Sequence, residues 1–170
     1  MGGATSRGAS GNVPIWDNMP VTVDATGEQR YDIPYKLSRG FTRETAQAIR
    51  TALRKMSEDI CIDFFEDDSS MYDDMISFIP GQGCYSWVGR TGGVQELSIG
   101  QGCDSSGTIQ HEVVHALGFH HEMVRPDRDQ FVKVHFEEIK QGKGRWKKTI
   151  SHLDRKIRFF SIFILFMFLH

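Results

Sequence analysis

The chain has 170 residues, of which 39% are hydrophobic and 25% are charged, and both proportions are ordinary for a folded globular domain. Its formal net charge of −2 conceals an asymmetry, because residues 1–142 carry 13 basic and 21 acidic side chains whereas residues 143–170 carry 7 basic and 1 acidic. An acidic body argues against nucleic acid as the partner, and the change of charge at residue 143 indicates a boundary between a domain and a tail.

The first part of the chain is a candidate lead-in followed by a strand. Residues 1–30 are rich in Gly, Ser, Asn and Pro, so we expect an extended or poorly ordered segment there. Residues 31–37 read YDIPYKL and predict a short strand, with Pro34 at or near a sheet edge because proline cannot donate a backbone hydrogen bond.

An amphipathic helix is expected next, with Thr42 as its N-cap. Hydrophobic side chains recur after Thr42 at spacings of three and four, which predicts about 18 helical residues with one buried face. The spacing then changes to two. Further strands, separated by glycine-rich turns, are predicted at residues 61–66, 75–81, 85–90 and 94–100.

A second helix is expected to begin after Thr108 as its cap and to run to about Leu117, and residues 132–136 alternate like one more short strand. The whole order is strand, helix, several strands, helix. It predicts an α/β (α+β) lobe that contains one mixed sheet and two long helices, the second of which carries the residues discussed next.

The stretch HEVVHALGFHHEMVRPDRD, residues 111–129, has the spacing of a catalytic metal site. His111 and His115 are four residues apart and therefore lie on one face of a helix. Glu112 lies about 100° further round, where it can reach a metal-bound water rather than the metal itself. Gly118 can adopt positive φ, end the helix and turn the chain back so that His121 supplies a third nitrogen.

Three nitrogen ligands and a water form the open arrangement of a catalytic zinc, with Glu112 as the general base that takes the proton of the water. His120 competes with His121 for the third position, although the spacing from Gly118 favours His121. The alternative is a pair of surface histidines on a solvated helix, but the pattern H-E-x-x-H-x-x-G-x-x-H is matched at all its specified positions, which favours the metal site.

The sequence resembles the astacin family of metzincin zinc endopeptidases. Residues 111–129 fit the extended motif of that family, H-E-x-x-H-x-x-G-F-x-H-E-x-x-R-x-D-R-D, at every specified position. Further matches are IPY, CIDF, GCYSWVGR and G-T-I-x-H-E, at residues 33–35, 61–64, 83–90 and 107–112. The resemblance implies a metzincin-like N-terminal lobe, and we expect an astacin-like catalytic domain over residues 31–142.

The resemblance also implies roles for single residues. One Zn²⁺ per chain would be held by His111, His115 and His121, with Glu112 as the catalytic base and Gly118 at the bend. Glu122 resembles the glutamate that engages the buried N-terminus in mature members, but it could equally orient a ligand or be a solvated acid. The expected partner is a protein or peptide substrate.

Residues 85–88 resemble the rim strand along which that family binds an extended peptide, by its backbone rather than its side chains. The group consists of Tyr85, Ser86, Trp87 and Val88. For Trp87 and Val88 the alternative is packing in the core.

Cysteines extend the resemblance. Cys84 and Cys103 match a disulfide of the family, and Cys61 resembles a cysteine that bonds to one near the end of a full domain; no such partner occurs here. A secreted protein is therefore expected, although the first residues contain no apolar run of the kind that a signal peptide has.

The resemblance ends after Gly142. The family pattern implies a second lobe with a Met-turn of the type S-x-M-H-Y, whereas the four tyrosines of this chain all precede the metal motif. We therefore expect either a zinc endopeptidase or, alternatively, a truncated lobe that binds zinc or peptides with impaired turnover. Residues 143–170 are basic and then apolar; the 11 residues 159–169 are too few for a membrane span. We interpret residues 143–170 as translated intron or frame-shifted sequence in preference to a segment that rests on a membrane surface.

Overall fold

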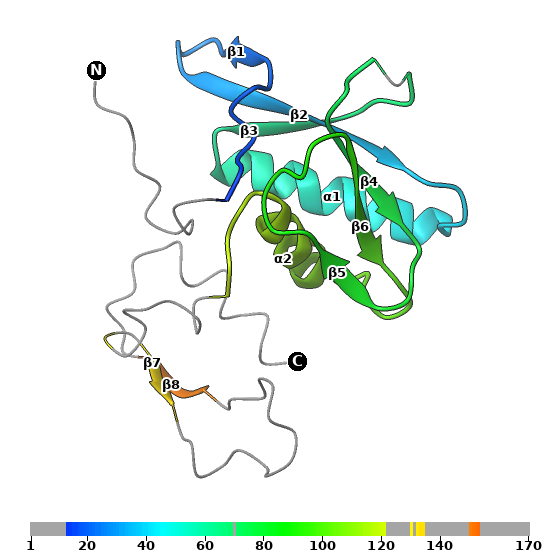
Figure 1. Cartoon of the computed structure of the whole chain (residues 1–170), viewed down its shortest axis with the longest axis vertical. Helices are drawn as coiled ribbons and strands as arrows, with labels where there is room; N and C mark the ends of the chain where they lie inside the picture. Colours follow the sequence, from blue (N-terminus) through cyan, green and yellow to red (C-terminus); the bar gives the residue numbers. More distant parts are fainter. Residues whose placement is uncertain (1–12, 70, 122–129, 131, 135–149, 154–170) are drawn as a thin grey trace. The chain divides into compact units, whose positions relative to one another are not determined.

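The computed structural model describes residues 13–69, 71–121, 130, 132–134 and 150–153 of the chain. It divides into two compact units, which meet in sequence between Phe119 and His120. The first unit contains all but two of the elements labelled in Figure 1. In chain order these are β1 (Val21–Val23), β2 (Gln29–Leu37), α1 (Arg43–Asp59), β3 (Ile62–Glu66), β4 (Met75–Ile79), β5 (Cys84–Ser86), β6 (Val94–Ile99) and α2 (Ser106–Ala116).

A mixed six-stranded sheet forms the frame of the first unit. Its strands follow the order β1-β2-β4-β6-β5, and β3 pairs with β2. The pairs of β2 with β3, β2 with β4 and β4 with β6 are parallel, whereas β1 and β5 pair antiparallel to their neighbours. The predicted mixed sheet with two helices is confirmed.

One edge of β2 pairs with two different strands, with β1 near the start of β2 and with β4 near its end. Tyr31 pairs with both β1 and β3, and Tyr35 pairs with both β3 and β4, so β1 and β4 share one edge of β2 and β3 takes the other. Asp32 donates its N–H toward the β1 side, to Pro20 O at 3.0 Å. Pro34 is two residues further on, so its missing N–H would face the same edge, where neither β1 nor β4 pairs with it.

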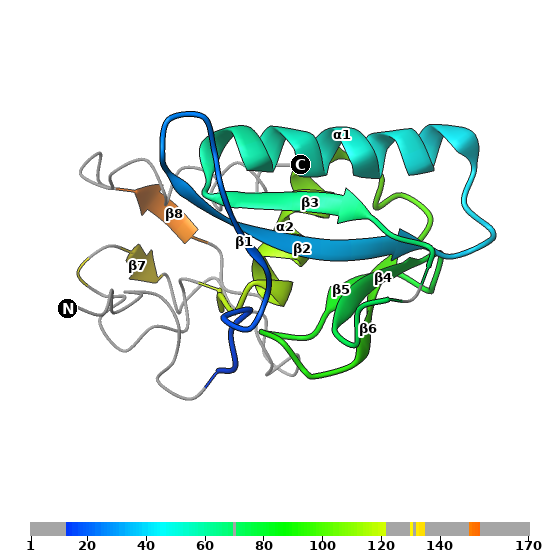
Figure 2. The ribbon, with the colours of Figure 1, turned by 90° about the horizontal axis from the view of Figure 1, so that it is seen from above.

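Helix α1 covers one face of this sheet, as Figure 2 shows for β2 and β3. The side chain of Thr42 accepts a hydrogen bond from Thr45 N, which confirms the predicted N-cap. The helix buries one face toward the strands, and this face presents Ile49, Ala52, Leu53 and Met56. These spacings of three, one and three are those of a single helical stripe.

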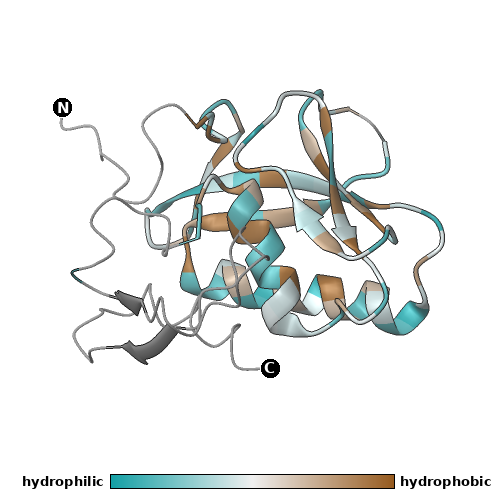
Figure 3. Cartoon of the chain, turned by 60° about the horizontal axis from the view of Figure 1, so that its bottom comes forward, coloured by the Kyte–Doolittle hydropathy of each residue, from teal (hydrophilic) through white to brown (hydrophobic). Residues whose placement is uncertain are grey.

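One hydrophobic core lies between the sheet and the two helices. Strand residues such as Ile33, Phe78 and Leu97 meet helix residues from both α1 and α2 in it. Figure 3 shows hydrophobic residues on the strands and on both helices. Helix α2 packs beside α1 and against β5 and β6. The core thereby fixes the position of the helix that carries the metal motif.

One of our expectations is corrected in this unit, and another is made more specific. Residues 13–30, expected to be an extended or poorly ordered lead-in, contain β1 and bury Trp16 and Met19 in the core. Helix α2 begins earlier than predicted: Ser105 is its N-cap and accepts from Thr108 N, so Thr108 is the donor of the cap. Neither a helix cap nor a three-residue strand produces a hydrophobic period, so these features could not be recognised in segments rich in Gly and Ser.

The second unit contains a two-stranded antiparallel sheet of β7 (Val132–Val134) and β8 (Ile150–Leu153). Strand β7 confirms the strand predicted at residues 132–136, and β8 lies in the segment expected to be a tail. The apolar run at residues 159–169 lies outside the described residues. Neither helix among the described residues combines the length and the apolar character that a membrane crossing requires.

Candidate metal centre

Helix α2 turns one face to the core and the neighbouring face to the candidate site. Ile109, Val113 and Ala116 are fully buried, at spacings of four and three. His111 and His115 are half-buried on the adjacent face. The same helix that anchors itself in the core therefore presents both imidazoles in one direction.

The two imidazoles meet at their outer nitrogens. The Nε2 atoms of His111 and His115 are 2.9 Å apart, and the ring planes cross at 81°. His115 Nδ1 lies 2.7 Å from the carbonyl oxygen of Phe119. A carbonyl can only accept a hydrogen bond, so Nδ1 carries the proton and the Nε2 lone pair of His115 points toward His111. That is the tautomer a metal ligand needs.

A bend at Gly118 follows the helix. Gly118 has φ of +106° and donates its N–H to His115 O at 2.8 Å, while Phe119 donates to Val114 O. A positive φ of this kind favours glycine. One ring nitrogen from each of His111, His115 and His121 lies within 4.8 Å of the others. His121 rather than His120 joins this group.

The donor set fits a zinc ion. Nitrogens that bind one tetrahedral zinc at about 2.0–2.1 Å lie roughly 3.3 Å apart, and the three nitrogens here lie within 4.8 Å of one another. Among the described residues, these three histidines form the only group of three or more His, Cys, Asp or Glu side chains close enough to share an ion. Three nitrogens from the described residues leave one position of a tetrahedral ion for a further ligand such as a water.

Glu112 is buried beside the histidines, with 6% of its surface exposed. Burial raises the pKa of its carboxyl from 4.5 to about 7. A carboxylate is costly in such a place unless a positive charge compensates it. A cation held by the three imidazoles would supply that charge and would oppose the shift of the pKa.

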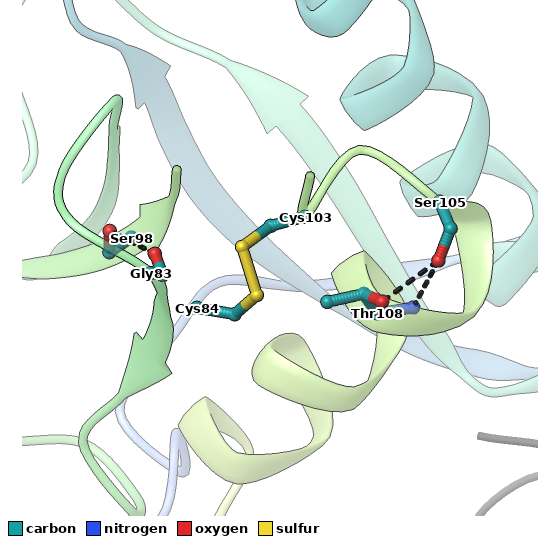
Figure 4. The surroundings of a disulfide bond; sticks show 6 residues. All are labelled: Gly83, Cys84, Ser98, Cys103, Ser105 and Thr108. Carbon is teal, nitrogen blue, oxygen red and sulfur yellow. Dashed lines mark hydrogen bonds between the residues drawn. A yellow bond between two sulfur atoms is a disulfide. The ribbon is translucent and has the colours of Figure 1, made fainter. Parts of the chain in front are cut away.

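A disulfide links the strand beside the site to the start of α2. Cys84 in β5 is bonded to Cys103, 19 residues later, as predicted (Figure 4). Figure 4 also shows Ser98 Oγ donating to Gly83 O and the cap of α2 formed by Ser105. Among the described residues Cys61 is the free cysteine, and it is exposed.

The predicted rim strand is shorter than expected. Strand β5 ends at Ser86, and Trp87 and Val88 follow it. β5 is the last strand on its side of the sheet, so its outer edge pairs with no strand in the part of the chain that is described. Tyr85 and Trp87 are 45% and 63% exposed, which is inconsistent with core packing of Trp87.

Glu122, another residue given a role in the sequence analysis, lies outside the described residues. In contrast, sequence reasoning missed Trp16, whose indole Nε1 donates to Ala116 O at the end of α2 over a distance of 2.9 Å. A tryptophan within a Gly- and Ser-rich segment was the one available signal, because large aromatic side chains are usually buried in part.

Comparisons with known proteins agree with this geometry. The family model described as Astacin, a family of peptidases, matches residues 24–156. Zinc metalloproteinase nas-4 of Caenorhabditis elegans is 38% identical over 136 residues, which are 77% of this chain and 43% of that protein. High choriolytic enzyme 2 of Oryzias latipes is 44% identical over 108 residues, which are 63% of this chain and 38% of that protein.

A solved structure is similar as well. High choriolytic enzyme 1, a hatching enzyme zinc-protease from Oryzias latipes, superimposes with a TM-score of 0.60 at 42% identity, over 66% of this chain and 56% of that chain. The chain spans less than half the length of the two curated relatives named above.

Proposed function

The chain belongs to the astacin family of peptidases, and from this premise we propose that it is a zinc-dependent metalloendopeptidase that hydrolyses peptide bonds in protein or peptide substrates. The observation that carries the proposal is the convergence of one nitrogen from each of His111, His115 and His121 next to the buried carboxyl of Glu112. Neither feature alone specifies hydrolysis; together they provide an open metal site and a base.

The three histidines would hold the zinc ion, which when bound acidifies a water molecule and polarises the carbonyl of the scissile peptide. His115 is oriented for this by its Nδ1–H, which donates to Phe119 O. Glu112 takes the proton of the attacking water and delivers it to the leaving nitrogen. Its burial beside the histidines supports this role, because it keeps the carboxyl next to the place where the ion and its water would lie.

The outer edge of β5 is the proposed place for the substrate. Its backbone groups can pair with an extended peptide, which would lie antiparallel or parallel to the strand. Tyr85 and Trp87 are exposed there and provide apolar surface for substrate side chains. Such edge pairing binds main chain and therefore tolerates many sequences. The disulfide between Cys84 and Cys103 fits action in an oxidising compartment outside the cytosol.

Glu112→Gln tests the proposed mechanism. The variant keeps the size of the side chain and cannot accept a proton, so we expect zinc content to remain and peptide cleavage to fall by roughly 100-fold or more. The measurement is hydrolysis of a quenched fluorescent peptide, together with metal analysis of the same sample. Glu58→Gln, an exposed glutamate on α1, is the matched control and should cleave like the wild type. Equal cleavage by the Glu112 variant would refute the role of this residue.

A second candidate function is a lobe that binds zinc or peptides without turnover. The outer edge of β5 with the exposed Tyr85 and Trp87 beside it favours this function, because a strand edge can hold a peptide backbone without cutting it. The same assay separates the two functions. Cleavage that a chelator abolishes supports the endopeptidase, whereas zinc content without cleavage in the wild type supports the binding lobe.

A further inference from the structure

The C-terminal end of α2 receives hydrogen bonds from two distant parts of the chain. Trp16 Nε1 donates to Ala116 O and Gly89 N donates to His115 O, both at 2.9 Å. The last carbonyls of an α-helix have no donor within the helix, and a buried carbonyl must find one elsewhere. Ala116 is fully buried. The end of the metal-binding helix is therefore held by groups that lie outside it.

Residues 13–16 and the loop around Gly89 are also bonded to each other. Arg90 N donates to Pro14 O at 2.9 Å, and Arg90 Nε donates to Ile15 O at 3.2 Å. Gly89 has φ of +79°, and a Cβ added there would lie 2.4 Å from both Pro14 O and a methyl carbon of Val13. The two segments are thus in contact along their backbones and leave no room for a side chain at Gly89.

Buried polar groups fix this loop on the side of the sheet. Arg90 Nη1 forms an ion pair with Asp74 Oδ2 at 2.6 Å, and Asn18 Nδ2 donates to the same oxygen at 3.0 Å. Gln95, in β6, donates from Nε2 to Gly89 O and accepts from Thr91 N. Gln95 lies in β6 and Asp74 directly precedes β4, so the loop is bonded to groups other than those of α2.

Building on the proposed zinc site, we propose that Trp16 and Arg90 are positioning residues for the metal centre. Neither residue would touch the ion. Trp16 holds Ala116, the neighbour of His115, and Arg90 holds the backbone of residues 14–15 from which Trp16 reaches the helix. His115 O additionally accepts from Gly118 N, so the same turn sets the bend toward the third histidine. A ligand turn that is held before metal binding loses less conformational freedom when the ion arrives.

The proposed role of Trp16 predicts that zinc affinity falls when its hydrogen bond to Ala116 is removed. Trp16→Phe removes the indole N–H and keeps an aromatic ring in the core. One lost hydrogen bond to a buried carbonyl should loosen the last turn of α2 and weaken zinc binding by roughly 3- to 10-fold. The control is Tyr35→Phe, which removes one hydroxyl donor from an equally buried ring: both Trp16 and Tyr35 are 5% exposed. Tyr35 bonds to Glu66, far in sequence from α2, so the zinc affinity of its variant should stay within twofold of the wild type.

The experiment measures the zinc dissociation constant of the full chain by competition with a chromophoric chelator, at a temperature where circular dichroism shows every variant folded. Weakening in Trp16→Phe and not in Tyr35→Phe supports the proposal. Equal affinities in both variants would overturn it, because a merely structural role lowers stability without changing the affinity of the folded protein. If Trp16→Phe does not fold, Arg90→Lys takes its place, since it keeps the charge facing Asp74 and loses the Nε–H donor to Ile15 O.

A second readout does not depend on zinc. In the metal-free chain, amide hydrogen exchange at Leu117 and Gly118 should be at least threefold faster in Trp16→Phe than in Tyr35→Phe, because these N–H groups bond within the turn that Trp16 holds. Unchanged exchange would overturn the positioning role even if zinc binds. A wild-type chain that binds no zinc would instead refute the proposed function, and the exchange data would still decide whether Trp16 holds α2.

Discussion

Two buried carboxyls of the first unit have pKa values shifted in opposite directions. Glu112 has a pKa raised to about 7 because it is desolvated. The pKa of Asp74 is lowered below 3.8, chiefly by the hydrogen bond from Asn18 and further by Gly93 N–H and Arg90, which together outweigh its burial. The difference lies in the donors that each carboxyl meets. In the metal-free chain Glu112 therefore titrates near neutral pH, whereas Asp74 is charged at pH 7.

Asp74→Asn should lower the free energy of unfolding by about 2 kcal/mol at pH 7, because the charged hydrogen bond and the ion pair to Arg90 are lost. The pKa of Asp74 is depressed in the folded state, so its stabilising effect is present above pH 3.8 and is lost as the pH falls through the folded-state value. The difference from the wild type should therefore narrow between pH 7 and pH 3.

Urea unfolding at both pH values measures this difference. Asp73→Asn is the control, since Asp73 is the exposed neighbour of Asp74. A deficit in Asp74→Asn that is the same at pH 3 and pH 7 would show that the charge of Asp74 does not stabilise the fold.

At the residue scale, the sequence predicted those site residues whose relation is local. His111, Glu112 and His115 lie on consecutive turns of one helix, so their spacing alone places them together. Trp16 could not be predicted to contact Ala116, because the two are 100 residues apart and the contact depends on the packing of the whole unit. Long-range partners of this kind leave no periodic pattern in the chain.

Elements with a strong hydrophobic period were predicted well. Helix α1 has a buried stripe and an N-cap at Thr42, and both could be recognised from the sequence. Strand β1 could not, because its three residues are all exposed and its pairing with β2 determines it. The start of α2 was placed at Thr108 rather than Ser105, since both are good caps and only the fold decides between them.

The disulfide joins two elements, and its removal should lower stability without abolishing the fold. Changing both Cys84 and Cys103 to serine should reduce the free energy of unfolding by about 3 kcal/mol, because the bond closes a loop between residues 19 apart and restricts the unfolded chain. Urea unfolding under non-reducing conditions gives the value. Cys61→Ser is the control, as this exposed cysteine forms no disulfide in the described structure, and its variant should unfold like the wild type. Equal stability of all three proteins would contradict the estimate.

At the scale of the whole molecule, the first unit has the fold of the family to which the chain belongs. Helix α2 packs against β5, the last strand on its side of the sheet, whose outer edge pairs with no strand among the described residues. Helix and edge thus bring together a candidate metal site and a candidate peptide site. This convergence followed from the resemblance and not from composition or hydrophobic period, which predict elements but not their arrangement.

The most direct test of the account is the zinc content of the purified full chain and of two variants at neighbouring positions. We predict one zinc per chain in the wild type and in His120→Ala, because His120 is outside the cluster, and a loss of most of the zinc in His121→Ala, which removes one of the three nitrogens. Metal analysis after dialysis measures all three. A wild type without zinc, or the same zinc content in both variants, would contradict the claim that His111, His115 and His121 share one ion.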